Sequence, residues 1–338
     1  MIRLPTARES ASCSPDAQTE LAPPQLKTQA PRPPKRAVNG ILLLDKPADL
    51  SSNGALQRVR RSLAAAKGGH TGNLDVAATG LLPLCFGEAT KVSAFLLDAD
   101  KVYVADIALG VTTSTGDREG EITRERPVPS LTQGDLESVL TGFLGEQSQI
   151  PPMYSALKRN GRPLYEYARA GIELERTARR INLYALRLVA QRAAGLVVEV
   201  HCSKGTYVRT LAEDIGEALG CGAHLSGLRR TRAGPFRLED AYPIERFEAG
   251  AADPASYDSM LLPIDRALGA FPALTLDPAA VRAVSYGQRV GPFDGSKPGL
   301  CRLYAHDGRF LGIADVDLAG VIAPRRMMQT LSGSSDPA

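Results

Sequence analysis

Residues 69–83 read Gly69-His70-Thr71-Gly72-Asn73-Leu74-Asp75-Val76-Ala77-Ala78-Thr79-Gly80-Leu81-Leu82-Pro83. The glycines permit tight turns and let a ligand approach the backbone closely. His70 and Asp75 stand five residues apart in a loop that we expect to run from Gly68 to Gly80. Loops on a rigid scaffold often carry the chemistry of an enzyme. Taken alone, this stretch is equally compatible with a structural turn capped by Asp75.

The hydrophobic pattern around this loop predicts strands. Continuous apolar runs at 40–45 and 81–86 indicate two buried strands. Residues 102–109 alternate between apolar and polar positions, which is typical of a half-buried strand. Residues 181–191 and 195–203 are expected to form a pair of neighbouring strands.

Apolar residues at helical spacing predict helices around 56–63, 136–144 and 208–219. The expected N-caps are Ser52 or Asn53 for the first and Thr206 for the third, and the expected stops are Gly145 and Gly220. Because strands and helices follow each other without regular β-α alternation, we expect an α+β fold around a mixed or mostly antiparallel sheet.

The two ends of the chain differ from its middle. Residues 1–37 contain seven prolines and few large apolar residues, so we expect a disordered tail. Residues 262–326 read as short strands broken by Gly, Pro and Asp, which indicates a small separate β-rich module. We expect residues 38–260 to form the main domain and residues 327–338 to be flexible.

Composition places the protein in a broad class. No apolar run reaches the roughly 18 to 20 residues of a membrane helix, and no signal peptide is evident, so we expect a cytoplasmic protein. The five cysteines are odd in number and irregularly spaced, which favours reduced thiols over a disulfide framework.

The net charge of +3 equals the excess of six basic over three acidic residues in the tail. Basic groups such as Arg229, Arg230 and Arg232 can hold phosphates or simply form solvated faces.

Two further stretches carry chemistry-bearing side chains. Ser203-Lys-Gly-Thr-Tyr-Val-Arg209 runs from a predicted strand into a helix, and free N–H groups at a helix start bind anions. Asp100-Lys-Val-Tyr103-Val104 places a tyrosine on a strand. Each stretch by itself is also compatible with an ordinary junction or an ordinary core strand.

Together, these stretches resemble the TruB family of tRNA pseudouridine-55 synthases. The similarity covers about residues 39 to 326. The matching segments, in order, are Asn39-Gly-Ile-Leu-Leu-Leu-Asp-Lys-Pro47, Gly69-His-Thr-Gly-Asn-Leu-Asp75, Ala78-Thr-Gly-Leu-Leu-Pro83, Gly87-Glu-Ala-Thr-Lys91, Ile150-Pro-Pro-Met-Tyr-Ser-Ala-Leu-Lys158, Leu164-Tyr-Glu-Tyr-Ala-Arg169 and His201-Cys-Ser-Lys-Gly-Thr-Tyr-Val-Arg209.

The resemblance implies a fold and a set of site residues. It implies the pseudouridine-synthase fold, an RNA-gripping insertion at 149–179 and a PUA-like RNA-binding domain at 262–326. Asp75 falls on the catalytic aspartate and Arg209 on the arginine that pairs with it. The other implied substrate-binding positions are Tyr103, which stacks on the base, Tyr207, His70, which enters the RNA loop, Leu228, which packs on the uracil, and Lys46 of the Lys-Pro motif, whose role is more structural.

The implied reaction isomerises uridine 55 in the T-arm loop of tRNA to pseudouridine. The N1–C1′ bond breaks, the base turns, and C5 joins C1′. A stacked base must be flipped out to be reached, and a carboxylate can then act as nucleophile or as base. An adjacent arginine keeps that carboxylate ionised. The resemblance implies a monomer that needs no metal, cofactor or guide RNA.

This chain departs from the family pattern at two positions. Val76 stands where the family usually has proline, which removes a fixed φ and adds an N–H. Asp49 stands where glycine is usual, although aspartate tolerates a left-handed backbone better than most residues.

Three alternative interpretations of the sequence differ in the residues that they require. A zinc site from His201, Cys202, Cys221 and His224 is disfavoured because adjacent strand residues point to opposite faces, which leaves Cys202 for the core. A non-catalytic tRNA-binding or tRNA-folding protein on the same scaffold would be expected to lack Asp75, Tyr103 or Arg209. A guide-RNA-dependent relative would be expected to lack the insertion at 149–179.

Overall fold

The computed structural model describes residues 34–248 and 253–329. Most of the tail predicted at 1–37, and residues 330–338 of the predicted flexible C-terminus, lie outside the described residues. Within the described part, Cys85, Cys202, Cys221 and Cys301 are buried and form no disulfide. No helix in this part is long and apolar enough to cross a membrane.

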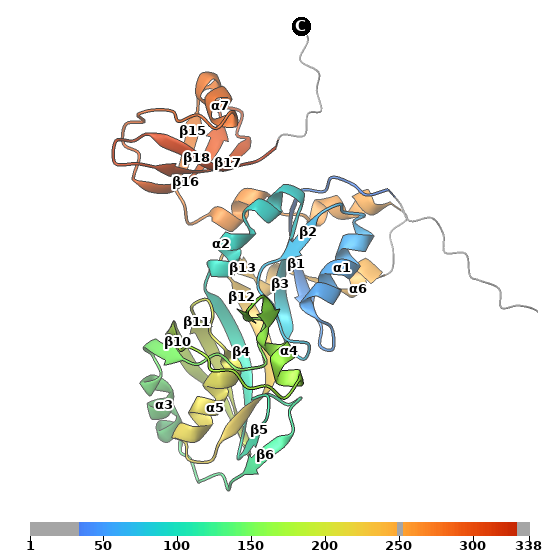
Figure 1. Cartoon of the computed structure of the whole chain (residues 1–338), viewed down its shortest axis with the longest axis vertical. Coiled ribbons are helices and arrows are strands. Elements are labelled where there is room, and N and C mark those ends of the chain that lie inside the picture. The colour runs from blue at the N-terminus through green and yellow to red at the C-terminus, as the bar shows by residue number, and fades with distance from the viewer. Residues whose placement is uncertain (1–33, 249–252, 330–338) are drawn as a thin grey trace, which may run out of the picture. The chain divides into compact units, whose positions relative to one another are not determined.

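The main body is built on one mixed sheet of ten strands, in the order β14-β1-β3-β12-β4-β11-β10-β7, with β2 beside β3 and β13 beside β12 (Figure 1). The pairs β1–β14 and β3–β12 are parallel, and the other pairs are antiparallel. The strands are β1 (Gly40–Lys46), β2 (Gly68–His70), β3 (Thr79–Phe86), β4 (Lys101–Leu109), β7 (Gly145–Gln149), β10 (Arg179–Arg192), β11 (Gly195–Cys202), β12 (Ala223–Ala233), β13 (Phe236–Arg237) and β14 (Tyr242–Pro243).

Helices pack on this sheet through their apolar faces. Helix α5 (Val208–Ala218) packs on β12 and β4, and α3 (Gln133–Gly142) packs on β10, so both cover the core built from β4 and β11. Helix α1 (Ser52–Ser62) lies beside β2 and α6 (Glu245–Glu248) and covers a second core built from β1 and β3 (Figure 1). The predicted α+β fold around a mixed sheet is confirmed.

Smaller elements complete the body. They are α2 (Ser93–Asp98), α4 (Leu164–Arg169), the hairpin of β5 (Val111–Thr113) and β6 (Ile122–Glu125), the hairpin of β8 (Lys158–Arg159) and β9 (Arg162–Pro163), and the 3-10 turns η1 (Gly87–Lys91), η2 (Leu238–Asp240), η3 (Pro254–Met260) and η4 (Ile264–Leu268).

A separate four-stranded sheet follows toward the C-terminus. Its order is β15 (Ala273–Leu276), β16 (Gly299–Ala305), β17 (Phe310–Val316) and β18 (Ile322–Met327), with helix α7 (Pro278–Ser285) packed against it. This sheet has a core of its own, in which Leu303 and Ile322 are fully buried. The short strands predicted within 262–326 are these four, the last of which runs one residue further.

Several predicted helix ends are wrong by a residue or more. The N-cap of α1 is Ser51, whose hydroxyl accepts from the N–H of Gly54, because Ser52 is buried and bonds Leu74 instead. Thr206 does not cap α5, since its hydroxyl donates to the Ser203 carbonyl and the helix begins after Tyr207.

Two predicted helix stops and the start of the Gly-rich loop have different outcomes. Helix α3 ends at Gly142, so Gly145 is not its stop but the first residue of β7. Gly220, with a φ of +81°, follows α5 as predicted. The expected loop at 68–80 begins as a short strand, because Gly68–His70 pairs with β3 as β2.

Candidate active site

An ion pair between Asp75 and Arg209 marks the centre of the site. Asp75 lies in the loop before β3, and Arg209 lies in the first turn of α5. The Nε of Arg209 is 3.2 Å from Oδ2 of Asp75. The arginine side chain is 7% exposed and the aspartate side chain 43% exposed. The carboxylate therefore faces an opening, whereas the cation that stabilises its charge is shielded from water.

Arg209 is held from three other directions. Its Nη2 donates to the carbonyl of Tyr154 at 2.6 Å, and its Nη1 donates to the carbonyl of Thr115 at 3.2 Å. Nη1 also lies 3.5 Å from Oδ2 of Asp117, whose side chain is 14% exposed. A guanidinium bound on several sides has little rotamer freedom, so these contacts fix its position against Asp75.

A cavity of about 260 Å³ opens beside this pair. Its wall is apolar where Tyr103 of β4 and Leu228 of β12 meet, and both side chains also pack on the core. The mixture of a flat apolar wall with a few convergent polar groups is typical of a small-ligand site. The sequence-predicted residues that line it are Asp75, Tyr103, Tyr207, Arg209 and Leu228.

Tyr103 and Tyr207 are both half-buried at the cavity. Burial raises the pKa of the Tyr103 hydroxyl, and the charge and a hydrogen bond of Arg230 act in the opposite direction. Burial also raises the pKa of Tyr207. The side chain of Gln149 holds the Tyr207 backbone from both sides, because Oε1 accepts from its N–H at 2.8 Å and Nε2 donates to its carbonyl at 3.1 Å.

The remaining two predicted residues, His70 and Lys46, do not line the cavity. His70 lies in β2 opposite Leu84, and its half-buried ring has an Nδ1 without a hydrogen-bond partner among the described residues. Burial lowers the pKa of His70, and the charge of Arg230 acts in the same direction.

Lys46 is fully buried at the end of β1. Its Nζ donates to the carbonyls of Pro47 at 2.8 Å, Leu50 at 2.6 Å and Val76 at 3.2 Å. The ammonium therefore ties the turn after β1 to the residue that follows Asp75. This geometry agrees with a structural role for the Lys-Pro motif.

Lys46→Met is expected to lower the free energy of unfolding by about 2–3 kcal/mol, because several buried carbonyls lose their donor. Burial lowers the pKa of Lys46 from 10.5 to about 8. Between these two values the unfolded chain binds more protons than the folded one, so the advantage of the wild type should grow as the pH rises from 8 to 10.5. Urea unfolding across this range measures both effects, and Lys67→Met, at an exposed lysine, is the control. Equal stability of the two variants would show that the hydrogen bonds of Lys46 do not stabilise the fold.

Both departures from the family pattern are accommodated locally. Asp49 has a φ of +60°, which is the left-handed backbone that a glycine would supply. Val76 is 42% exposed, and its carbonyl is the one held by Lys46. The loop closes through a hydrogen bond from the N–H of Ala78 to the carbonyl of Asp75 at 3.1 Å.

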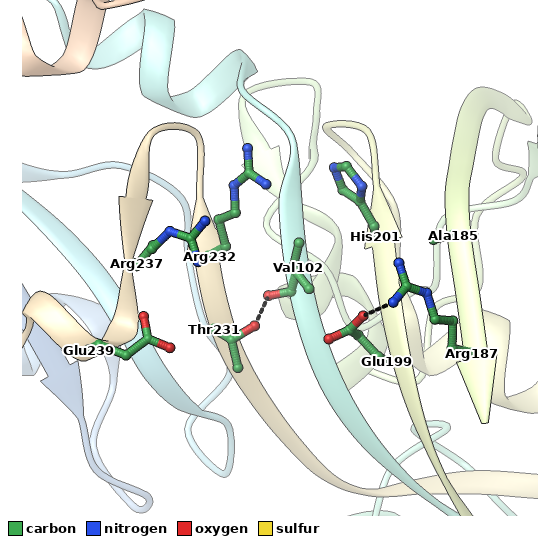
Figure 2. Close-up of a pocket in the computed structure, with 9 residues that line it drawn as sticks. All are labelled: Val102, Ala185, Arg187, Glu199, His201, Thr231, Arg232, Arg237 and Glu239. Atoms are coloured by element: carbon green, nitrogen blue, oxygen red, sulfur yellow. Dashed lines mark hydrogen bonds and ion pairs between the residues drawn. The ribbon is translucent and has the colours of Figure 1, made fainter. Parts of the chain in front are cut away.

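A second hollow, of about 360 Å³, includes His201, Val102 and Arg187 (Figure 2). Val102 lines this hollow and the adjacent Tyr103 lines the first cavity, so the two lie on opposite faces of the sheet. Arg187 is 3.8 Å from Glu199 here, so part of the charge is balanced.

His201 and its neighbour Cys202 also point to opposite faces of the sheet. His201 lines the second hollow, whereas Cys202 is 1% exposed in the core, as predicted. This placement removes the geometric basis of the zinc hypothesis. Among the described residues, no group of three or more His, Cys, Asp or Glu side chains is placed to hold a metal ion.

Sequence reasoning missed four side chains that shape the site. Gln149 and Asp117 hold Tyr207 and Arg209, and Lys101 and Arg230 line the cavity. Arg230 stood in a basic run that indicated a phosphate contact or a solvated face, but it is only 1% exposed. The one available signal was its neighbourhood, since Arg230 lies two residues after the predicted Leu228.

Three family models match consecutive parts of this chain. The model of the TruB family pseudouridylate synthase N-terminal domain matches residues 60–208. The model of the tRNA pseudouridylate synthase B C-terminal domain matches residues 209–269, and that of the pseudouridine synthase II TruB C-terminal region matches residues 272–328. The chain belongs to the TruB family.

Relatives named tRNA pseudouridine synthase B are similar over most of the chain. The protein from Chromohalobacter salexigens is 51% identical over 301 residues, which cover 88% of this chain and 97% of that protein. The protein from Azoarcus sp. is 52% identical over 301 residues, which cover 89% of this chain and 98% of that protein.

Solved structures share the fold at lower identity. A chain in the structure of an H/ACA RNP bound to a substrate RNA containing 2'-deoxyuridine has a TM-score of 0.65 and 23% identity, covering 87% of this chain and 86% of that chain. A chain in the structure of a Cbf5-Nop10-Gar1 complex has a TM-score of 0.65 and 25% identity, covering 86% of this chain and 85% of that chain.

Proposed function

We propose that this protein is a tRNA pseudouridine synthase in which Asp75 is the catalytic carboxylate. The observation that carries the proposal is the Asp75–Arg209 ion pair at 3.2 Å, which opens into a cavity walled by Tyr103 and Leu228. The names of relatives about 50% identical over most of the chain support the same reaction.

The arrangement suits each step of the isomerisation. A uridine that is flipped out of its stack can enter the cavity and recover stacking on Tyr103, which is worth about 1–3 kcal/mol per base. Asp75 then acts at the sugar, and either role, nucleophile or base, requires an ionised carboxylate. The buried Arg209, with its Nε 3.2 Å from this carboxylate, orients it. The N1–C1′ bond breaks, the base turns, and C5 bonds to C1′.

We further propose that the target is uridine 55 in the T-arm loop, read largely through RNA shape. In this proposal His70 enters the RNA loop, residues 149–179 grip the RNA, and residues 262–326 form a PUA-like domain that contacts the tRNA. The protein acts as a cytoplasmic monomer without cofactor or guide RNA. The connection from the insertion to the cavity through Gln149 and Tyr207 supports this assignment.

Pseudouridine formation in an unmodified tRNA transcript, mapped to the nucleotide, tests the proposal. The assay contains purified protein and neither cofactor nor guide RNA. Modification at position 55 alone is the expected result. Tight binding without modification would support a tRNA-folding protein instead, and modification at another uridine would overturn the target while keeping the reaction.

Tyr103→Phe is expected to slow product formation by about 100-fold, the lower end of what a group that assists proton transfer contributes. The ring, and therefore stacking on the base, is retained, so the Kd for tRNA should stay within about threefold. Single-turnover kinetics with enzyme in excess separate the two quantities. A variant as fast as wild type would show that the hydroxyl has no part in the reaction.

A further inference from the structure

Arg230 of β12 is a buried cation that touches both sides of the Asp75 loop. It is 1% exposed. Its Nη2 donates to the carbonyl of Gly72 at 3.2 Å, and its Nε donates to the carbonyl of Leu81 at 2.7 Å. Gly72 precedes Asp75 by three residues, and Leu81 follows it by six. One side chain therefore bonds the backbone on both sides of the loop that carries the Asp75 carboxylate.

The backbones of the neighbouring strand β3 and of the Asp75 loop lie close to Arg230. Arg230 lies opposite Gly80 of β3 and opposite Tyr103 of β4 in the sheet register. Gly80 has a φ of +100°, and a Cβ on it would lie 2.3 Å from the Arg230 carbonyl oxygen. Gly72 also has a φ of +100°, and its Cβ would lie 3.4 Å from Nη1 of Arg230. Gly80 therefore lets β3 approach the backbone of Arg230 closely, whereas a Cβ on Gly72 would only reach van der Waals contact with the guanidinium.

Arg230 is held by hydrogen bonds and not by an ion pair. Among the described residues, no carboxylate lies within ion-pair distance of its guanidinium, in contrast to the neighbouring Arg229, which is 2.7 Å from Asp45. A buried cation is unfavourable unless hydrogen bonds compensate it, and here the carbonyls of Gly72 and Leu81 do so. Arg230 also lines the cavity and interacts with the Tyr103 hydroxyl, which connects it to the reacting groups.

We propose that Arg230 is a positioning residue for the reaction, which holds the Asp75 loop by its Gly72 and Leu81 carbonyls and sets the carboxylate against Tyr103. The inference rests on the proposed function. The two hydrogen bonds come from different nitrogens of one rigid plane, and such geometry is available to arginine but not to lysine. This plane acts beside the bonds that Lys46 makes to Val76 and Ser52 makes to Leu74 in the same loop.

The test compares Arg230→Met and Arg230→Lys with Arg229→Met, the matched control on the adjacent, partly exposed arginine. Single-turnover pseudouridine formation, the Kd for tRNA and thermal unfolding are measured for each. Arg230→Met is expected to lower the single-turnover rate about 100-fold with a Kd within about threefold of wild type. Arg230→Lys, which can bond one carbonyl at a time, should regain part of that rate, and Arg229→Met should keep all of it.

Three results would overturn the proposal. They are a rate for folded Arg230→Met within threefold of wild type, a loss that appears in the Kd instead of the rate, and an Arg230→Lys variant as fast as wild type. If Arg230→Met does not fold, Arg230→Lys decides alone: a rate at least tenfold lower at unchanged Kd supports the proposal. Wild-type protein in the same assay separates the two hypotheses, because an inactive wild type counts against the proposed function.

Amide hydrogen exchange gives a readout that does not depend on activity. In Arg230→Lys without RNA, amides of residues 72–78 should exchange faster than in wild type or Arg229→Met, because the loop has lost one of the two hydrogen bonds that Arg230 makes to it. Unchanged exchange at these residues would overturn the positioning role even if activity falls.

Discussion

Asp75→Asn is expected to abolish pseudouridine formation and to leave most of the affinity for tRNA. The substitution keeps the shape of the side chain but removes the negative charge, so the group can serve neither as nucleophile nor as base. We expect the single-turnover rate to fall by about 10³-fold or more, toward the upper end of what one catalytic group contributes. The Kd should change little, because binding to RNA is distributed over many phosphate contacts.

The structure offers a matched control for this variant. Asp49→Asn makes the same chemical change at an exposed turn with a φ of +60°, a backbone that asparagine also tolerates. It should retain the wild-type rate. Stability should be nearly unchanged in Asp75→Asn, because the carboxylate is 43% exposed and the pair is screened by water. An Asp75→Asn enzyme that modifies RNA at the normal rate would refute the assigned mechanism.

Much of the scaffold was predictable from the sequence because its signals are local. The apolar runs of β1 and β3 and the alternation in β4 depend only on which faces are buried. The helix ends were less predictable, since several neighbouring residues can cap a helix. Ser51 and Ser52 both carry a hydroxyl, and only the long-range hydrogen bond of Ser52 with Leu74 decides which of them is free to cap.

The site residues also differ in whether a local sequence signal or a long-range contact identifies them. The resemblance supplied residues of conspicuous motifs, and five of the seven lie around one cavity. Arg230 and Gln149 could not be found in this way, because their partners are distant in sequence. Arg230 bonds Leu81 across 149 residues, and Gln149 bonds Tyr207 across 58. The first pairing exists only once β12 lies beside β3, and the second only once β7 has paired with β10, next to β11.

Arg209→Met is expected to reduce both activity and stability, which distinguishes it from Asp75→Asn. Its removal leaves the largely buried Asp117 without its cation and the carbonyls of Thr115 and Tyr154 without a donor. We expect a loss of about 2–4 kcal/mol in unfolding free energy, since breaking a buried pair leaves an uncompensated charge. The partly exposed bond to Asp75 adds little to that figure.

The rate should fall by about 10²- to 10³-fold, because the carboxylate loses its orientation and the positive charge beside it. Urea unfolding and single-turnover kinetics measure the two losses, and Arg126→Met, which breaks an ion pair with Glu217 near the far end of α5, is the control. The double variant Asp75→Asn, Arg209→Met should be no slower than Asp75→Asn alone, since the two groups act as one unit. If the two losses of rate instead multiply, Arg209 acts on the substrate independently of Asp75, and the ion pair is not the catalytic unit.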